Sequence, residues 1–254
     1  MKKQPATKLM AMVITVFLFC LGCSITSFAQ LSVGIEGGYT RNYLQTNNAN
    51  RDFTDYMPGN GFSVGIPVQY KIANWFAIAL DPSYTQKNYL QQRSSFYEGT
   101  YQISTNSYLE LPVMGHFMFG GEKLQGFFNL GGFAGYWLSG SVKGRMPNVL
   151  NPTDNVTATN TFYYYSNAYS YNEKYTFDTR RDNRIEAGWV AGAGASYAIT
   201  SKYTVFAEGR MMQSVTDMQK SYMINQTPRY NNTYGANLGI MVNFGKKQPT
   251  TNNQ

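Results

Sequence analysis

The sequence predicts an all-β fold: a transmembrane, eight-stranded antiparallel up-and-down β-barrel with long extracellular loops. Eight segments alternate apolar residues with small or polar ones, which gives each strand one lipid-facing wall and one interior wall. Long and short connections follow one another in strict alternation, an asymmetry typical of outer-membrane barrels. The chain is also rich in Tyr (21) and Phe (16), while only 14% of its residues are charged. This balance suits a barrel with aromatic girdles.

The predicted strands are stretches of alternating residues. They cover residues 31–39, 62–72, 76–87, 108–119, 127–138, 184–199, 203–211 and 234–244. In the last of them Leu238, Ile240 and Phe244 share the apolar face, whereas Asn237 and Gly239 lie on the other face. The fifth strand is apolar on both faces. We assign to its outward, lipid-facing side Phe128, Leu130, Ala134, Tyr136 and Leu138.

Three prolines fall within the predicted strands. Each lacks the backbone N–H that a ladder needs. We therefore expect β-bulges at Pro67, Pro82 and Pro112, since a closed barrel must bend somewhere.

The connections predict which end of the barrel faces which compartment. Tight connections are expected around residues 73–74, 121–123 and 200–201, and long ones at about 41–60, 88–102, 140–183 and 215–232. Outer-membrane barrels have short periplasmic turns and long extracellular loops, so an even strand number puts both termini in the periplasm. The largest loop carries a tyrosine cluster, and its residues 161–177 could form a hairpin. It is either a variable solvated surface or a contact surface, since aromatic-rich loops on a rigid scaffold often bind a partner.

The predicted chain has three parts: a cleaved signal peptide at 1–29, an outer-membrane β-barrel at 30–245 and a disordered periplasmic tail at 246–254. The leader has three lysines, an apolar stretch too short to span a bilayer comfortably, and Ser27-Phe28-Ala29 before the cleavage point. Lipid attachment at Cys23 is the alternative processing. Both cysteines lie in the leader, so we expect neither a disulfide nor thiolate chemistry in the barrel.

Charge argues against a nucleic-acid partner. Removing the three leader lysines from the 21 basic residues leaves 18 against 14 acidic residues. This excess is mild and its charges are scattered along the chain, whereas nucleic-acid binding requires a basic patch. We expect no nucleic-acid partner.

The interior walls collect ten ionisable residues. They are Glu36, Lys71, Asp81, Lys87, Glu110, His116, Arg184, Glu186, Glu208 and Arg210. Eight strands leave an interior about wide enough for side chains to fill, and an unpaired buried charge is costly, so opposite charges should pair. We predict a lumen plugged by salt bridges rather than an open pore; the alternative is that these residues polarise a watery interior. Cross-strand pairing is expected between the doublets Arg184/Glu186 and Glu208/Arg210.

His116 is the only histidine, which limits the chemistry that the chain can perform. A multi-histidine metal site is excluded, and a Ser-His-acid device would have to use this imidazole. Glu110 and Tyr108 share its face, and we expect them to hydrogen-bond it. We predict no catalytic, cofactor-binding or metal-binding residues and no cofactor.

The end of the last strand resembles the terminal signal that outer-membrane assembly machinery reads. That signal has a polar residue, a glycine two positions on, and apolar residues ending in an aromatic. The residues that match it are Asn237, Gly239, Val242 and Phe244. We expect this machinery to be a partner of the chain.

Three segments resemble a known family, the PorT-like outer-membrane β-barrel proteins of Bacteroidetes. Residues 108–113 (YLELPV) are similar to the Tyr-Leu-Glu-Ile-Pro segment of that family, and 128–136 (FNLGGFAGY) and 187–197 (AGWVAGAGASY) resemble its Gly-rich fifth and sixth strands. Glu186 departs from the Asp-Phe-Gly-like step expected before the last segment. The resemblance covers nearly the whole mature chain and implies an OmpA-like, eight-stranded barrel in the outer membrane. It implies no agreed activity: one namesake is associated with secretion of proteases, and no catalytic residues carry over.

Three functions remain open for such a barrel. We expect a structural or interaction role through the extracellular loops 140–183 and 215–232, with outer-membrane lipids and protein partners as contacts. The alternative is an accessory of protein secretion or small-ligand transport across the outer membrane, and a third is a lipid-modifying barrel enzyme. A soluble lipocalin-like barrel is the rival fold, which would need an apolar lumen and a polar exterior.

Overall fold

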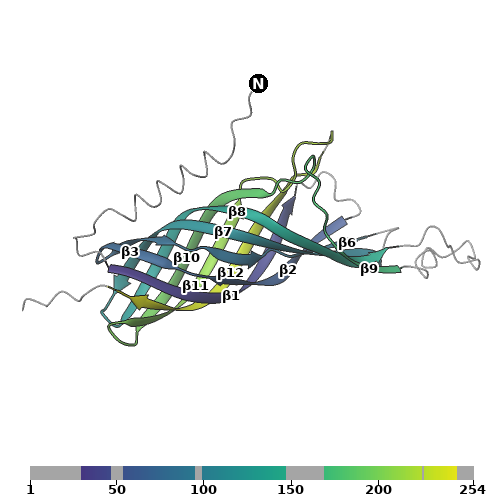
Figure 1. Cartoon of the computed structure of the whole chain (residues 1–254). Helices are drawn as coiled ribbons and strands as arrows, with labels where there is room; N and C mark the ends of the chain where they lie inside the picture. Colours follow the sequence, from purple (N-terminus) through teal and green to yellow (C-terminus); the bar gives the residue numbers. More distant parts are fainter. Residues whose placement is uncertain (1–29, 47–53, 95–98, 147–168, 225, 245–254) are drawn as a thin grey trace, which may run out of the picture.

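The computed structural model describes residues 30–46, 54–94, 99–146, 169–224 and 226–244 (Figure 1). The expected leader at 1–29 and tail at 246–254 lie outside these residues. The described chain contains twelve β-strands. They are β1 (Gln30–Thr46), β2 (Thr54–Gly65), β3 (Val68–Ala73), β4 (Phe76–Leu80), β5 (Ser83–Gln86), β6 (Tyr89–Arg93), β7 (Tyr101–Gly120), β8 (Leu124–Met146), β9 (Tyr169–Lys174), β10 (Ile185–Ala198), β11 (Tyr203–Ser214) and β12 (Arg229–Asn243). No helix in these ranges is long and apolar enough to cross a membrane.

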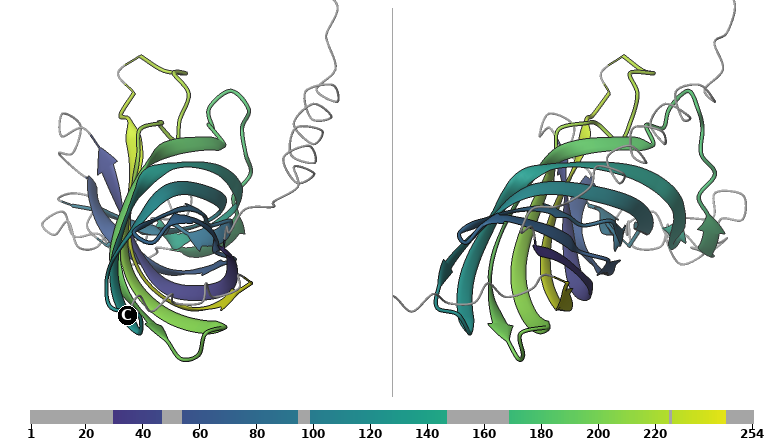
Figure 2. Two further views of the ribbon diagram at one scale, coloured as in Figure 1. Left: turned by 90° about the vertical axis from the view of Figure 1, so that its left-hand side faces the viewer. Right: turned by 60° about the vertical axis from the view of Figure 1, so that its left-hand side comes forward.

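The strands form one antiparallel sheet that closes on itself. β1 pairs with β12 on one edge, with Glu36 opposite Gly239, and with β2 and β3 on the other edge. β2 and β3 together make one crossing of the barrel, and β4, β5 and β6 make another. With β1, β7, β8, β10, β11 and β12 the ring has eight crossings (Figure 2). The predicted eight-stranded barrel is therefore confirmed.

Side chains alternate between the two walls of the barrel as the sequence predicts. Ile35 on β1 is 65% exposed, while the adjacent Glu36 is 5% exposed. The alternation holds even in the doubly apolar β8, where Phe128 is exposed and its neighbours Phe127 and Asn129 are buried. An apolar outer wall around a polar interior is the arrangement of a barrel in lipid, the reverse of a lipocalin-like barrel.

The short connections lie where the sequence places them, between β3 and β4, between β7 and β8, and between β10 and β11. At the opposite end the strands run past the predicted limits: β1 continues to Thr46, β7 begins at Tyr101 and β8 continues to Met146. The four predicted long loops are therefore too long. Polar side chains do not end these ladders, because antiparallel pairing needs only backbone N–H and C=O groups.

Together with the outer ends of β7 and β8, β9 extends the barrel wall at the end opposite the short connections (Figure 1). It pairs with the outer part of β8, with Ser141 opposite Lys174 and Met146 opposite Tyr169. Of the hairpin expected at 161–177, residues 169–174 form β9 and pair with β8, so the hairpin itself stays a prediction. Residues 161–168 lie outside the described residues.

Two of the three strand prolines interrupt their strands. Pro67 lies in the break between β2 and β3, and Pro82 in the break between β4 and β5. The pairing register is unshifted across both breaks, so the bulges expected at these two prolines are wrong. Pro112 instead lies inside β7 in register with Phe133, so the bulge expected there is wrong. On its other edge Pro112 faces the break between β4 and β5, where it accepts a bond from the Asp81 N–H (3.1 Å) and needs no ladder donor.

Candidate functional site

The lumen holds one arginine among three carboxylates. Nη1 of Arg210 lies 3.2 Å from Glu36 Oε1 and 2.5 Å from Asp81 Oδ2. Its Nη2 lies 2.6 Å from Glu208 Oε2. All four side chains are buried, and they come from β1, from the break between β4 and β5, and from β11. This arginine network therefore joins strands that are not neighbours in the sheet through charge-assisted hydrogen bonds.

Glycines make room for the arginine network. Gly192 of β10 lies opposite Arg210 of β11, and a Cβ at Gly192 would lie 2.2 Å from Glu208 Oε1. A Cβ at Gly65 on β2 would lie 2.8 Å from Asp81 Oδ1. Each of these two carboxylates thus occupies space that a larger residue would fill, and the Gly-rich strands of the sequence are the signal for this close approach.

Amide side chains extend the arginine network along the lumen. Asn129 Nδ2 donates to Glu208 Oε1 (2.8 Å), and His116 Nδ1 lies 2.7 Å from Asn129 Oδ1. On the other side Asn237 Nδ2 donates to Glu36 Oε1 (3.3 Å). Asn237, which the sequence pattern assigns to assembly, therefore also has a contact within the folded lumen.

The expected partners of His116 are not the observed ones. Its ring contacts Asn129 and Phe127, and the Phe127 ring centroid lies 4.8 Å away. Glu110 lies six residues from His116 on the same strand, which is roughly 20 Å at the usual rise per residue, and Tyr108 lies further still. Sharing a face therefore does not bring these groups together. Neither observed partner of His116 is a nucleophile.

A second ion cluster, the lysine network, surrounds Lys87. The Lys87 Nζ lies 2.5 Å from Glu110 Oε1 and 2.9 Å from Glu186 Oε2, and all three side chains are buried. The ammonium also lies 4.8 Å from the ring centroid of Phe133 and 5.2 Å from that of Tyr108. Both distances are within the range of cation–π attraction.

Two of the ten predicted interior charges belong to neither network. Lys71 is half-buried near the short connection after β3, and the described residues offer it no ion pair. Arg184 lies 4.5 Å from the ring centroid of Tyr136 and 4.2 Å from that of Phe177. Its Nε donates to the Trp137 carbonyl oxygen (2.9 Å). Arg184 therefore contacts aromatic rings and a backbone carbonyl rather than either ion network, and it precedes β10, where strand alternation begins.

The expected pairing between the doublets on β10 and β11 is also wrong. The register puts Arg210 opposite Gly192 and Glu208 opposite Gly194. Glu186 lies six residues before Gly192 along β10 and reaches the lysine network instead. Strand register, which alternation does not specify, decides which charges meet.

A small cavity lies beside the arginine network. A cavity of about 20 Å³ borders Arg210 and Met212 and is lined by hydroxyl groups that include Thr40 and Thr85. This volume holds about one water molecule. In the ranges that the structure describes, no group of three or more His, Cys, Asp or Glu side chains could hold a metal ion.

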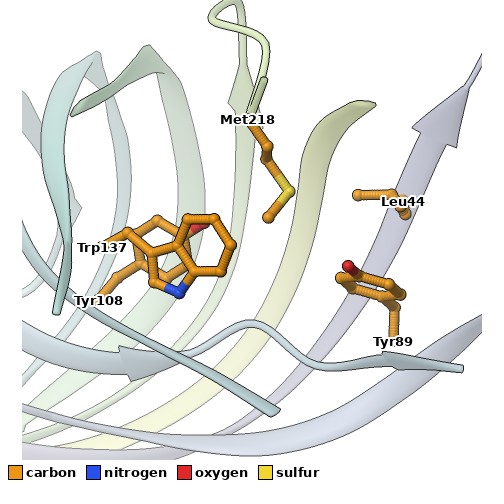
Figure 3. Close-up of a cluster of buried hydrophobic side chains, with 5 residues drawn as sticks. All are labelled: Leu44, Tyr89, Tyr108, Trp137 and Met218. Atoms are coloured by element: carbon orange, nitrogen blue, oxygen red, sulfur yellow. The ribbon is translucent and has the colours of Figure 1, made fainter. Parts of the chain in front are cut away.

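A layer of apolar side chains lies on the long-connection side of the lysine network (Figure 3). This aromatic layer consists of Leu44, Tyr89, Tyr108, Trp137 and Met218, all of them buried. Trp137 stacks on Tyr108, with ring centroids 5.9 Å apart and planes 10° apart. The Met218 side chain lies between this pair and the side chains of Leu44 and Tyr89 (Figure 3). The lumen is thus filled at three levels.

A larger cavity, the vestibule, lies outside the aromatic layer and has a volume of about 320 Å³. Tyr89, Trp137 and Met218 belong both to the aromatic layer and to its lining. Its polar lining includes Gln91, Gln102, Asn106, Arg181, Gln219 and Arg229. The sequence did not predict this cavity, because its walls come from β6, β7, β8, the start of β12 and two connections that only the folded chain brings together.

The connections 175–184 and 215–224 bind each other and form one wall of the vestibule. The Asn183 N–H donates to the Met218 carbonyl oxygen (2.9 Å), and the Lys220 N–H donates to the Arg181 carbonyl oxygen (2.8 Å). These bonds give two segments far apart in sequence a defined joint conformation.

Asp182 is the ionic centre of this wall. It accepts hydrogen bonds from Arg181 Nε (2.9 Å), the Tyr175 hydroxyl (2.9 Å) and the Asp178 N–H (2.8 Å). Burial acts to raise the pKa of Asp182, but these bonds stabilise the carboxylate and hold its pKa below the usual value. Burial and the bond to Asp182 raise the pKa of Tyr175, so its hydroxyl remains a donor.

A closed antiparallel ring with an apolar outer wall is the arrangement of outer-membrane barrels. The family model described as the outer membrane protein beta-barrel domain matches residues 28–220. The chain belongs to the outer membrane protein beta-barrel domain family. This outer membrane β-barrel protein is therefore located in the bacterial outer membrane.

Several solved structures are similar to this outer membrane β-barrel protein. Neisserial surface protein A is 12% identical over 84% of this chain and 97% of its own, with a TM-score of 0.39. The attachment invasion locus protein Ail of Yersinia pestis is 12% identical over 86% of this chain and 100% of its own, with a TM-score of 0.38. OprG from Pseudomonas aeruginosa is 10% identical over 85% of this chain and 96% of its own, with a TM-score of 0.45. A comparison with curated proteins finds no match.

Proposed function

We propose that this outer membrane β-barrel protein has a structural and interaction role at its extracellular end and that its lumen does not conduct. One observation carries the proposal: the arginine network, the lysine network and the aromatic layer fill successive levels of the lumen. A path for ions or solutes would have to separate buried ion pairs, which is costly. The ordered connections around the vestibule and β9 are then the parts available for contacts.

We infer that the end with the short connections faces the periplasm and that both termini lie there. The asymmetry in connection length supports this orientation. The Phe244 N–H donates to the Leu31 carbonyl oxygen (2.8 Å), which puts the first and last strand ends side by side. The partners that we propose are outer-membrane lipids on the apolar wall, protein partners at the extracellular loops, and the assembly machinery. That machinery would read Asn237, Gly239, Val242 and Phe244.

We also assign the chain to the PorT-like barrels of Bacteroidetes, a finer placement within its family. Its support is the motif at 108–113, which lies in β7, together with the two Gly-rich segments. Those segments pair with each other across β8 and β10, with Ala193 opposite Phe128. One namesake of that family is associated with secretion of proteases, but we do not infer that role for this chain from the family placement.

Planar-bilayer recordings of the purified protein test the closed lumen. We expect no steady conductance, and large steady currents would contradict the proposal. A deletion strain tests the role in the cell. Altered envelope integrity or adhesion with unchanged secretion is the expected phenotype, whereas loss of a secreted cargo would favour a secretion accessory.

We propose no enzymatic activity. The single imidazole, His116, is buried and contacts an amide and a phenyl ring rather than a nucleophile. The membrane lipid profile of the deletion strain checks this proposal. If the deletion alters the lipid profile, the wild-type gene and a gene with His116→Ala are each returned to the strain. Reversal of the change by the wild-type gene but not by the His116→Ala gene would contradict the proposal.

A further inference from the structure

The vestibule has the dimensions and the lining of a pocket for a small polar ligand. Its volume of about 320 Å³ falls within the range of known small-molecule sites, at the lower end. The aromatic layer closes it toward the lumen. The Trp137 ring of this layer already stacks on Tyr108 and on Tyr175. Recognition in the vestibule therefore depends on polar groups more than on ring stacking.

Amide side chains on β6 and β7 are held in place by their neighbours. Gln102 Nε2 donates to Gln91 Oε1 (3.3 Å) and to Ser104 Oγ (3.2 Å), and the Tyr171 hydroxyl donates to Gln102 Oε1 (3.1 Å). Each amide has two N–H donors and an oxygen with two lone pairs, so these bonds use only part of the capacity of the pair. Groups that both donate and accept, such as the hydroxyls of a sugar, complement such a surface.

The charges of the lining favour an anion. Three charged residues line the vestibule: Arg181, Asp182 and Arg229. Asp182 is already paired with Arg181 and accepts two further hydrogen bonds. The buried Nε of Arg229 has no hydrogen-bond acceptor among the described residues. Guanidinium groups bind carboxylates through parallel N–H···O bonds, so an acidic ligand supplies the acceptor that Arg229 lacks.

We propose that the vestibule binds an acidic saccharide of one or two rings, an inference that rests on the proposed contact role of this end. Sugar hydroxyls match the amides and a sugar carboxylate matches Arg229. An apolar ligand of the same size would strip water from the amides and arginines without replacing their hydrogen bonds, which is unfavourable. The volume is too small for a folded protein segment.

The test is calorimetric titration of the mature protein in phospholipid nanodiscs with glucuronic acid. Glucose, which lacks the charge, and cyclohexanecarboxylate, which lacks the hydroxyls, are the comparison ligands. We expect glucuronate to bind at least about tenfold more tightly than either comparison ligand. Glucose loses the charge-assisted hydrogen bond to Arg229, and cyclohexanecarboxylate loses several neutral hydrogen bonds to the amides.

Two variants assign the binding to the vestibule. Arg229→Gln removes the charge and should weaken glucuronate binding at least about tenfold. Arg145→Gln makes the same chemical change at an exposed position of β8 outside the vestibule and should leave the affinity unchanged. Gln102→Ala is a second vestibule variant in case Arg229→Gln folds poorly. Heat-modifiable migration on a gel checks folding in each case.

Three outcomes would overturn the inference: no binding of glucuronate, equal affinity for either comparison ligand, or unchanged affinity in both vestibule variants. Nanodiscs containing the lipopolysaccharide of the cell separate two sources of the sugar. If glucuronate no longer binds in these nanodiscs, the acidic sugars of the membrane itself fill the vestibule. If glucuronate binds as before, free glycans are the ligand, and both results support the inference. A barrel that neither binds sugar nor conducts would reject this inference while leaving the proposed function standing.

Discussion

Arg210→Met is the sharpest perturbation of the filled lumen. The side chain lost is the cationic partner of Glu36, Asp81 and Glu208, and all of these groups are buried. Removing one partner of a buried ion pair typically destabilises a protein by about 3–5 kcal/mol, because the remaining charge is uncompensated. Three carboxylates lose their cation here, so we expect about 5 kcal/mol, a change of three to four orders of magnitude in the unfolding equilibrium.

Urea unfolding in lipid vesicles measures this change. Tryptophan fluorescence follows the transition, and heat-modifiable gel migration reports the folded fraction independently. Lys71→Met is the matched control, since Lys71 makes no ion pair among the described residues and should change stability by less than about 1 kcal/mol. An Arg210→Met protein within about 1 kcal/mol of the wild type would refute the reasoning.

A rescue variant distinguishes charge from packing. Replacing the three carboxylates by their amides in the Arg210→Met background removes the uncompensated charge at nearly constant volume. Buried ion groups can often be replaced by neutral ones with little loss of stability. Most of the lost stability should therefore return; if none returns, the effect of Arg210→Met comes from lost packing.

Three further perturbations have defined outcomes. A Cβ at Gly131 would lie 2.0 Å from the Val113 carbonyl oxygen, so Gly131→Ala should lower the free energy of unfolding by about 1–3 kcal/mol. Gly37→Ala, whose Cβ meets nothing closer than 3.8 Å, should stay within about 0.5 kcal/mol in the same urea titration. Trp137→Ala should lower it by about 3–5 kcal/mol, because the aromatic layer loses its largest side chain. The pKa of Asp182 is lowered in the folded protein, so its carboxylate stabilises the vestibule wall above about pH 4 and loses that contribution as the pH falls further. Trp137 fluorescence should report this loss, and Asp182→Asn should abolish its pH dependence; an identical pH profile in both proteins would count against it.

Much of the barrel was predictable because strand alternation is a local property. Side chains two residues apart share a face whatever the rest of the chain does, so the interior position of Glu36 and the outward position of Phe128 follow from the sequence. The ends of the strands were less predictable. β1 and β8 continue through polar residues, since ladder bonds depend on a partner backbone rather than on side-chain type.

The partners within the lumen were not predictable from alternation. His116 and Glu110 share a face of β7 but bind different groups, because six residues of strand separate them. Glu186 meets Lys87 rather than Arg210 because register, not face, sets the height of each side chain in the barrel.

The sequence by itself determined that the chain forms eight antiparallel crossings with an apolar outer wall and charged residues inside. That information is carried by period-two alternation and by connection lengths, both of which are local. Only the tertiary structure decided that the charges divide into an arginine network and a lysine network, and that two distant connections enclose the vestibule. These features depend on strand register and on contacts between segments far apart in the chain, which no local pattern specifies.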